Sequence, residues 1–282
     1  MFSINRILVP VNFQSGTEEA LSTAKGIAKR QHSEVFLLHV IDSAREIDGE
    51  SLINNIINGR SPALGYSLDK LSELENKLAR VGIKSTSLVR QGSIVGNILH
   101  LVKTKGIDLM VLGIRHHSFF DYLFGMIKKL IDEAPCPILT VPRKKEEFKR
   151  VLIPVLQFNN AIEKYEYARP IIKRNKAFAN LTAFLSSEAP VMKNSLILLL
   201  ELLEEKLRDD LIPFESSASI THDFSHSVLK SASEDNSDLI VLPDSIRQGI
   251  PDYIFGSSTH RIVNNSPVPV LSINSRTAMK DL

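Results

Sequence analysis

A glycine followed by two serines is the first group in this sequence that could do chemistry. Gly256, Ser257 and Ser258 open a stretch of helical periodicity that runs through Val263. A glycine lets backbone amides approach a phosphate closely, and the first turn of a helix offers unpaired N–H groups. The alternative interpretation is that Ser257 only caps the helix. Both interpretations stay open at this point.

Two pairs of histidines could bind a metal ion or a phosphate. His116 and His117 follow Arg115. Adjacent side chains point in different directions on most backbones, so an exposed loop pair is the favoured interpretation. His222 and His226 have the i,i+4 spacing that places two zinc ligands on one face of a helix. They are the candidate metal ligands of this chain, although no further ligand is evident.

Asp223, which directly follows His222, favours a simpler interpretation of this pair. In the internal repeat described below, His222 corresponds to Gly92 and Asp223 corresponds to Ser93, at the start of a helix. Asp and Ser are both good N-caps, because their side-chain oxygens accept hydrogen bonds from the first-turn amides. We therefore favour a capping Asp223 flanked by solvent-facing histidines, with a zinc-binding regulator as the less favoured alternative.

Cysteine and the common catalytic motifs give little support for an enzyme. Cys136 stands between two prolines without an activating neighbour in sequence, which is typical of a small packed apolar residue. The sequence contains no G-x-S-x-G elbow, no H-E-x-x-H and no P-loop. We therefore expect no catalytic residues.

Composition narrows the classes of partner and compartment. The chain has 282 residues, 34 Lys and Arg against 32 Asp and Glu, 43% hydrophobic residues and one Cys. The near-neutral charge argues against a nucleic-acid or anionic-membrane partner. One Cys excludes an internal disulfide and a zinc site of four thiolates, and its usage fits a reducing cytoplasm. The length suggests about two domains.

The N-terminus and the most apolar run give no sign of a membrane protein. The first residues lack the charged, apolar and small-residue pattern of a signal peptide. The run Leu196–Leu200 is stopped by Glu201, far short of the ~20 apolar residues that span a bilayer. We expect a core-facing helix here and a soluble, cytoplasmic protein.

The chain repeats itself. Four blocks occur twice in the same order, and the last three recur at nearly constant separation. Such order is hard to obtain by chance, so the chain consists of two copies of one unit, joined by the basic stretch 143–150. The blocks begin at Ile7 and Val151 (Ile-Leu-Val-Pro-Val and Val-Leu-Ile-Pro-Val), at Asp108 and Asp238 (Asp-Leu-Met-Val-Leu-Gly and Asp-Leu-Ile-Val-Leu-Pro), at Tyr122 and Tyr253 (Tyr-Leu-Phe-Gly and Tyr-Ile-Phe-Gly), and at Pro135 and Pro267 (Pro-Cys-Pro-Ile-Leu-Thr-Val and Pro-Val-Pro-Val-Leu-Ser-Ile).

Short apolar runs alternate with helical stretches within each unit. Apolar runs without polar alternation are typical of strands buried on both faces, as in parallel sheets covered by helices. Ligands of such sheets bind outside the carboxyl ends of the strands, which directs attention to Asn12, Val40 and Gly113. In the first unit the predicted strands are 7–11, 35–40, 109–112 and 138–141, and the predicted helices are 17–31, 68–81 and 94–105.

Together the repeated blocks resemble the universal stress protein family in its tandem, two-domain form. The resemblance covers about residues 3–143 and 148–274. It implies an α/β fold of two tandem open-twisted, mainly parallel five-stranded sheets flanked by helices, of the adenine nucleotide alpha hydrolase-like, Rossmann-like type. We expect domains at 1–147 and 148–276, here called the first and second half, and a C-terminal tail at 277–282.

The resemblance also implies a nucleotide site, whose motif is incomplete in the first half. Nucleotide-binding members carry an Asp at the end of the first strand and G-x2-G-x9-G-[ST] after the fourth. Asn12 replaces the Asp, and Gly113 fills the first glycine. His116 stands at the second glycine, and Gly125 lies one residue before the third, which is Met126.

The second half has lost the other part of the motif. Leu156 stands at the position of the Asp, and Pro243 and Ile246 stand at the first two glycines. Only Gly256 and Ser257 are in register. The hypothesis is that neither half binds ATP tightly. A residual site would take ATP or another adenine nucleotide at Asn12, Val40, Gly113, Gly125, Gly256, Ser257 and Ser258, and no cofactor is required.

The last strand of each half predicts how the halves pair. In the family that the chain resembles, this strand pairs across a two-fold axis, and a tandem chain can make the same contact internally. We therefore expect 137–141 to pair with 269–273, with a homodimer and unknown protein partners left open. The function expected is a non-enzymatic stress-response regulatory binding protein. The alternative is an adenine-nucleotide-binding sensor, for which the resemblance implies at most a slow ATP hydrolysis.

Overall fold

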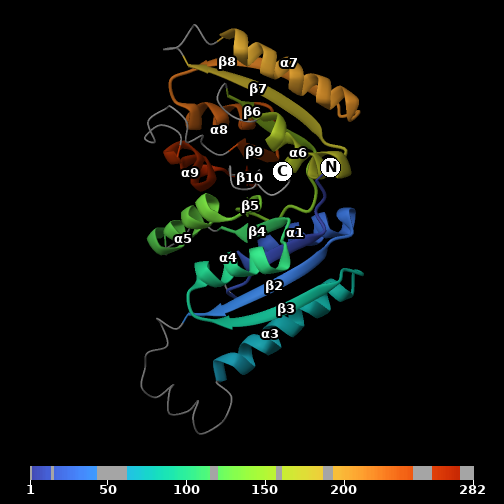
Figure 1. The fold of residues 1–282 in the computed structure, drawn as a ribbon, viewed down its shortest axis with the longest axis vertical. Coiled ribbons are helices and arrows are strands. Elements are labelled where there is room, and N and C mark those ends of the chain that lie inside the picture. The colour runs from blue at the N-terminus through green and yellow to red at the C-terminus, as the bar shows by residue number, and fades with distance from the viewer. Residues whose placement is uncertain are drawn as a thin grey trace.

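The computed structural model describes residues 2–13, 16–42, 62–114, 120–156, 161–186, 193–243 and 256–273. Within these ranges the chain alternates between strands and helices, and the order of elements in the second half repeats that of the first (Figure 1). In the first half these elements are β1 (Arg6–Pro10), α1 (Thr17–Gln31), β2 (Glu34–Ile41), α3 (Pro62–Ala79), β3 (Ser85–Gln91), α4 (Ile94–Lys105), β4 (Leu109–Gly113), α5 (Phe120–Glu133) and β5 (Ile138–Val141).

The second half follows the same pattern after the linker 143–149. Its β6 and β9 are the counterparts of β1 and β4 in the repeated sequence blocks. The elements are β6 (Arg150–Val155), α6 (Ala161–Asn175), β7 (Phe178–Ser186), α7 (Lys193–Asp209), β8 (Phe214–Thr221), α8 (Phe224–Glu234), β9 (Leu239–Pro243), α9 (Gly256–Asn265) and β10 (Val270–Ile273).

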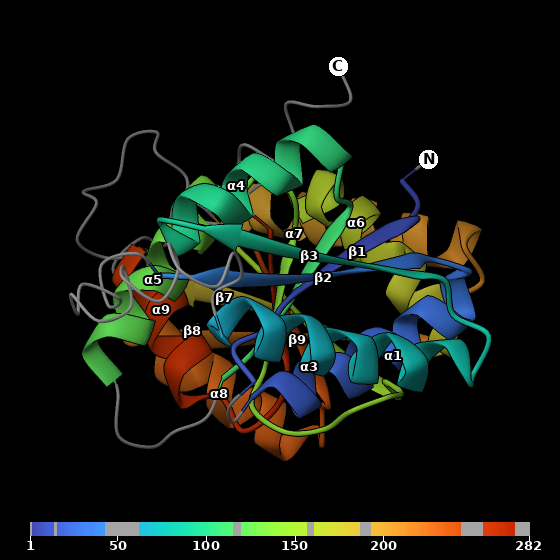
Figure 2. The same ribbon diagram turned by 90° about the horizontal axis from the view of Figure 1, so that it is seen from below.

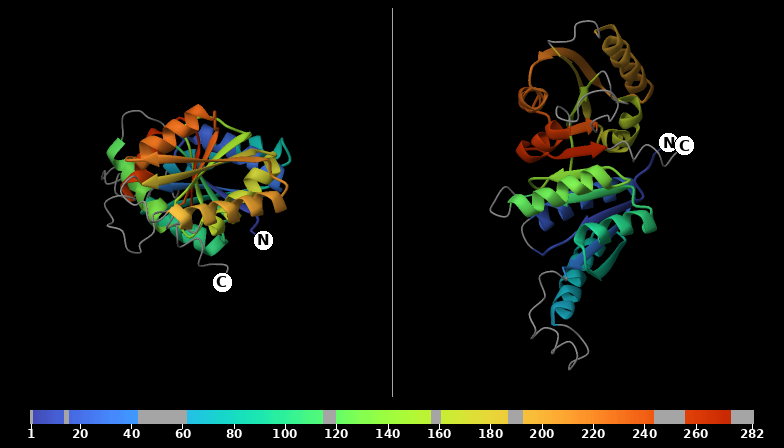
Figure 3. Two further views of the ribbon diagram at one scale, coloured as in Figure 1. Left: turned by 90° about the horizontal axis from the view of Figure 1, so that it is seen from above. Right: turned by 60° about the vertical axis from the view of Figure 1, so that its left-hand side comes forward.

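All ten of these strands form one continuous sheet. Their order is β3-β2-β1-β4-β5-β10-β9-β6-β7-β8, so the sequence-based expectation of two five-stranded sheets describes the halves of a single sheet (Figure 1). Pairing is parallel within each half. The one antiparallel pair described is β5 with β10, in the register Val270↔Thr140, Leu271↔Leu139 and Ser272↔Ile138. This pair joins the two half-sheets edge to edge, so the halves lie one above the other in the right-hand view of Figure 3.

Helices cover both faces of the sheet, which explains the unbroken apolar runs of its strands. In the first half α1 and α3 lie on one face and α4 lies on the other (Figure 2). Alternate residues of β1 accordingly enter two cores: Ile7 and Val9 pack in one, and Leu8 packs in the other. Each core contains residues of both halves, so the fold has two shared layers rather than one core per half.

The strands and helices predicted in the first half are confirmed, but the helix predicted at 68–81 is α3, which runs from Pro62 to Ala79. Helix α5 was not predicted. Helix α1 has the predicted bounds, and α4 ends at Gly106, whose φ of 59° is the left-handed conformation that favours glycine. The edge strands β3 and β8 were missed. Their sequences, Ser-Thr-Ser-Leu-Val-Arg-Gln and Phe-Glu-Ser-Ser-Ala-Ser-Ile-Thr, are largely polar, because an edge strand has one neighbour and much of it faces solvent.

The run Leu196–Leu200 lies in α7, one face of which packs in the core, but within the run only Leu196 is buried, whereas Ile197 and Leu198 are exposed. Leu196, Leu203 and Leu207 are buried in the core. In the described ranges, no helix combines the length and hydropathy needed to cross a bilayer.

Candidate functional site

The candidate site of the first half lies where three adjacent parallel strands end. Strand β1 pairs with β2 on one side and with β4 on the other, so Asn12, Val40 and Gly113 lie at one edge of the sheet. The backbone N–H of Val11 donates to the carbonyl of Leu38 over 2.8 Å, which extends the ladder to the residue before Asn12. The sequence-based placement of these residues at one edge is therefore confirmed.

Asn12 is held by the first residue of α1. The hydroxyl of Thr17 donates to Oδ1 of Asn12 over 3.0 Å, and the backbone N–H of Asn12 lies 3.4 Å from Thr17 Oγ1. The Asn12 side chain is exposed in spite of these contacts. An amide in this position offers both a donor and an acceptor to a ligand, without the charge of an Asp.

Three aromatic rings lie beside Asn12. The rings of Phe13 and His39 have centroids 4.4 Å apart, and the rings of Phe13 and Tyr66 meet edge to face at 6.0 Å. Nδ1 of His39 lies 2.9 Å from the carbonyl oxygen of Val11, which fixes the orientation of the imidazole. This arrangement provides planar apolar surface next to hydrogen-bonding groups, as a nucleoside requires.

Gly113 is a glycine because another backbone occupies the space of its side chain. A Cβ built on Gly113 would overlap the carbonyl oxygen of Gly16, and a Cβ on Gly16 would lie 2.9 Å from the carbonyl oxygen of Gly113. Gly16 caps α1 with a φ of 100°, and its N–H donates to the buried Glu19 carboxylate over 3.1 Å. The absence of a side chain at 113 is thus explained by the packing of α1, without a bound phosphate.

The other residues assigned to the phosphate loop lie on helices. Gly125 is exposed and is the sixth residue of α5, beyond the first four amides that a helix leaves unpaired. Gly256, Ser257 and Ser258 are the first three residues of α9. Because this helix already begins at Gly256, Ser257 lies within its first turn, and the interpretation of Ser257 as the N-cap is wrong.

At the corresponding position of the second half, an apolar residue replaces Asn12. Leu156 follows β6 as Asn12 follows β1, and its half-buried side chain packs against the core that contains α8 and α9. Leucine makes no side-chain hydrogen bond. The two halves thus share a backbone arrangement and differ in the chemistry at the end of their first strand.

Comparison with known proteins identifies the family. Residues 3–142 and 171–274 match the sequence model of the universal stress protein family. The chain belongs to this family. The second match begins within α6, so β6 and Leu156 lie outside it.

One curated protein of half the length and two solved structures of full length are similar to this chain. Universal stress protein YxiE of Bacillus subtilis (strain 168) is 26% identical over 148 residues, which are 49% of this chain and 98% of the relative. The crystal structure of a universal stress protein from Archaeoglobus fulgidus matches this chain with a TM-score of 0.75 at 20% sequence identity. The match covers 95% of this chain and 96% of the chain in that structure. The crystal structure of a protein of unknown function from Pseudomonas aeruginosa PAO1 matches with a TM-score of 0.64 at 16% sequence identity. That match covers 98% of this chain and 94% of the chain in that structure. The last two share the tandem fold.

The histidine pair at 222 and 226 does not form the zinc arrangement that its spacing allows. His222 precedes α8, whereas His226 lies in its first turn, so the two side chains do not share one face of a helix. Among the described residues, no group of three or more His, Cys, Asp or Glu is placed to hold a metal ion. Arg115, His116 and His117 lie outside the described residues.

Asp223 is the N-cap of α8, as the alignment with Ser93 predicts. Its carboxylate accepts from the backbone N–H of His226 over 3.1 Å and from the hydroxyl of Ser225 over 2.7 Å, and Arg261 lies 3.0 Å away. The hydrogen bonds from Ser225 and His226 lower the pKa of Asp223 to about 2. Cys136 is buried in the core that contains α5, as expected of a packed apolar residue.

Two aspartates of the repeated blocks have a structural role that the sequence analysis missed. Asp108 precedes β4 and accepts from the backbone N–H groups of Asn5 and Arg6 over 2.8 and 2.9 Å. Asp238 precedes β9 and accepts from those of Lys149 and Arg150 over 2.9 and 3.1 Å. The recurrence of Asp at the start of both blocks was the available signal.

Proposed function

We propose that this tandem universal stress protein is a non-catalytic binding protein of the stress response, in which the second half has lost its nucleotide site. The observation that carries the proposal is the contrast between Asn12 and Leu156. At equivalent strand ends, one half presents an exposed amide held by Thr17, and the other presents a leucine that packs into the core.

The packing of Gly113 supports the same proposal. A glycine at this position is the part of the phosphate-binding motif that the first half retains. Contact with Gly16 accounts for it in the absence of any nucleotide. The presence of Gly113 is therefore weak evidence for a phosphate-binding loop, and we expect no tight binding of ATP in either half.

Calorimetric titration with ATP tests the proposal. We expect no low-micromolar affinity for the unmodified protein. Asn12→Asp restores the residue of nucleotide-binding members and is expected to strengthen any binding, whereas Leu156→Asp in the second half is the matched control and is expected to add none. Low-micromolar binding of ATP to the unmodified protein would contradict the proposal.

A second candidate is an adenine-nucleotide sensor in the first half. The aromatic group of Phe13, His39 and Tyr66 beside Asn12 favours it, because a base can stack on such rings while the amide binds its polar edge. A nucleotide with fewer phosphates, such as a diphosphate or a cyclic form, would make smaller demands on the phosphate loop. Nucleotide absorbance in the purified protein, abolished by Asn12→Ala, is the result expected of this candidate.

A further inference from the structure

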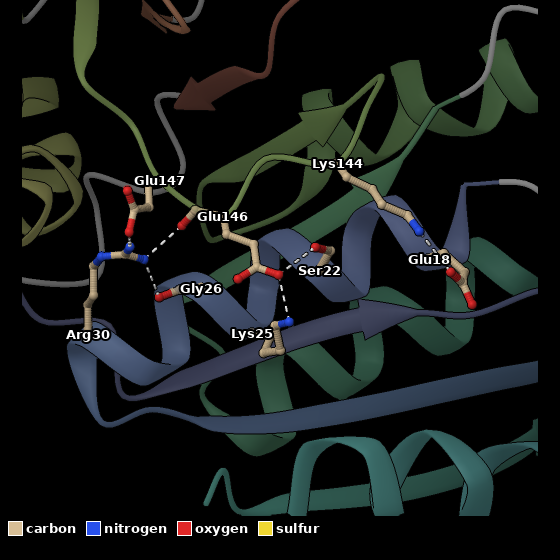
Figure 4. A network of polar contacts seen from close by, with 8 residues as sticks. All are labelled: Glu18, Ser22, Lys25, Gly26, Arg30, Lys144, Glu146 and Glu147. Atoms are coloured by element: carbon tan, nitrogen blue, oxygen red, sulfur yellow. Dashed lines mark hydrogen bonds and ion pairs between the residues drawn. The ribbon is translucent and has the colours of Figure 1, made fainter. Parts of the chain in front are cut away.

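The linker between the halves lies along one side of α1 (Figure 4). Near the start of the helix, Nζ of Lys144 donates to the Glu18 carboxylate over 3.0 Å. Further along, the carboxylate of Glu146 accepts from the hydroxyl of Ser22 over 3.1 Å and lies 2.6 Å from Nζ of Lys25. These contacts fall about one helical turn apart, so they form a stripe along the helix.

The last turn of α1 continues the stripe. The guanidinium of Arg30 donates to the backbone carbonyl of Glu146 over 2.7 Å and to the carboxylate of Glu147 over 2.6 Å (Figure 4). The hydrogen bond from Lys25 lowers the pKa of Glu146. Each exposed ion pair contributes little alone, but several that share one backbone segment restrict it together.

Gly26 lets the linker backbone lie directly on the helix. A Cβ at this position would overlap the carbonyl oxygen of Glu146 and come within 2.8 Å of its Cα. The atoms in conflict belong to the linker backbone, which cannot rotate away as a side chain can. Glycine in a helix interior lowers stability by about 0.5–1 kcal/mol relative to Ala. Gly26 therefore permits the close approach of the linker at the expense of helix propensity.

Other residues of the same linker bind the second half. Nζ of Lys145 lies 2.8 Å from the carboxylate of Asp238, which also accepts from the backbone N–H of Lys149. Phe148 is buried in the core, and its N–H donates to the side chain of Asn175 at the end of α6 over 3.1 Å. The linker is therefore attached on one side to α1 and on the other to β9 and α6.

Helix α1 also builds the candidate site of the first half. Its cap Gly16 lies against Gly113, and its first residue, Thr17, binds Asn12. A change in the position of α1 would move both of these contacts. The segment that holds α1 is the same segment that is attached to the second half.

We propose that residues 144–149 are a two-sided clamp through which the second half sets the position of α1, and with it the ligand-binding edge at Asn12 and Gly113. The regulatory meaning of this clamp rests on the second candidate function, an adenine-nucleotide sensor at that edge. The mechanical coupling does not, because it can be measured on the protein without any ligand.

Hydrogen exchange and limited trypsin digestion of the ligand-free full chain test the clamp. Gly26→Ala places a methyl group where the Glu146 backbone lies. The expected result is at least tenfold faster exchange at 144–149, faster cleavage after Lys144 or Lys145, and faster exchange of the amides around Gly16 and Thr17. Gly65→Ala in α3 is the matched control, because a Cβ there meets no atom within 4 Å, and all these rates are expected to stay unchanged.

A charge reversal gives a second test that adds no steric conflict. Glu146→Lys is expected to speed exchange of the linker, and Lys25→Glu combined with it is expected to restore protection. Unchanged linker exchange in both Gly26→Ala and Glu146→Lys would overturn the clamp. Faster linker exchange with unchanged exchange at Gly16 and Thr17 would overturn the coupling. Failure to bind any adenine nucleotide would overturn the nucleotide-sensor candidate at this edge and leave these rates as expected.

Discussion

At the scale of single residues, the two halves use equivalent polar side chains to hold the same backbone positions. Arg6 donates to the carbonyl of Lys105 at the end of α4, and Arg150 donates to the carbonyl of Asp235 at the end of α8. Ser93 and Asp223 cap the helices that follow the edge strands. These residues satisfy helix ends that would otherwise leave unpaired backbone groups.

Replacement of the two caps by alanine tests the hydrogen bonds that they accept. Asp223→Ala and Ser93→Ala are each expected to lower the free energy of unfolding by about 1 kcal/mol, because each leaves first-turn amides without an acceptor. Chemical denaturation at pH 7 measures both. A loss for one variant and none for the other would contradict the equivalence of the caps.

The charge of Asp223 adds a pH dependence that Ser93 lacks. Its pKa is lowered from 3.8 to about 2 in the folded chain, so the charged form stabilises the fold. The stability advantage of the unmodified protein over Asp223→Asn is expected to be complete above pH ~4, the ordinary range of an Asp, and to disappear as the pH falls to about 2. Denaturation curves of the two proteins over this range measure it, and a constant difference would contradict the charge effect.

At the scale of elements, close approaches between backbones constrain the position of α1 relative to β4 and the linker. Gly16 meets Gly113 at the start of the helix, and Gly26 meets the linker near its end. Both contacts need glycine because another main chain occupies the space of the Cβ. These two contacts, one near each end of α1, therefore constrain the position of the helix.

Replacement by alanine is expected to change stability in opposite directions at Gly113 and Gly125, two glycines assigned to the same motif. Gly113→Ala forces its methyl group into the Gly16 backbone and is expected to lower stability by about 1–3 kcal/mol, as overpacking does. Gly125→Ala meets no atom within 4 Å on an exposed helix and is expected to raise stability by about 0.5–1 kcal/mol. Thermal and urea unfolding without ligand check both values. A neutral Gly113→Ala would contradict the packing explanation.

At the scale of the whole molecule, the seam between β5 and β10 makes two repeats into one folding unit. Thr140 donates from its hydroxyl to the carbonyl of Val270 over 3.2 Å, and Leu139 and Leu271 are opposed and buried. Both cores cross this seam. We expect the two halves to unfold together in a single transition, measured by agreement of the calorimetric and van't Hoff enthalpies.

A lysine at the seam tests this unity. Leu271→Lys buries an ammonium group without an acidic partner and is expected to cost about 3 kcal/mol or more. Ser219→Lys on the exposed edge strand β8 is the control and is expected to change stability by no more than about 0.5 kcal/mol. Equal stabilities of the two variants would contradict the importance of the seam.

The sequence by itself determined the two repeats, most of the strands and helices, the Asp223 cap and the edge at which Asn12, Val40 and Gly113 meet. These features depend on local patterns: buried runs, helical periodicity and strand ends in a parallel sheet. Tertiary structure alone decided why residue 113 is a glycine and where the linker lies. Gly113 meets Gly16, and Glu146 meets Gly26, across about a hundred residues of chain, a separation over which no local pattern extends. The edge strands β3 and β8 also emerged only in the fold, because exposure removes the apolar pattern by which a buried strand is recognised.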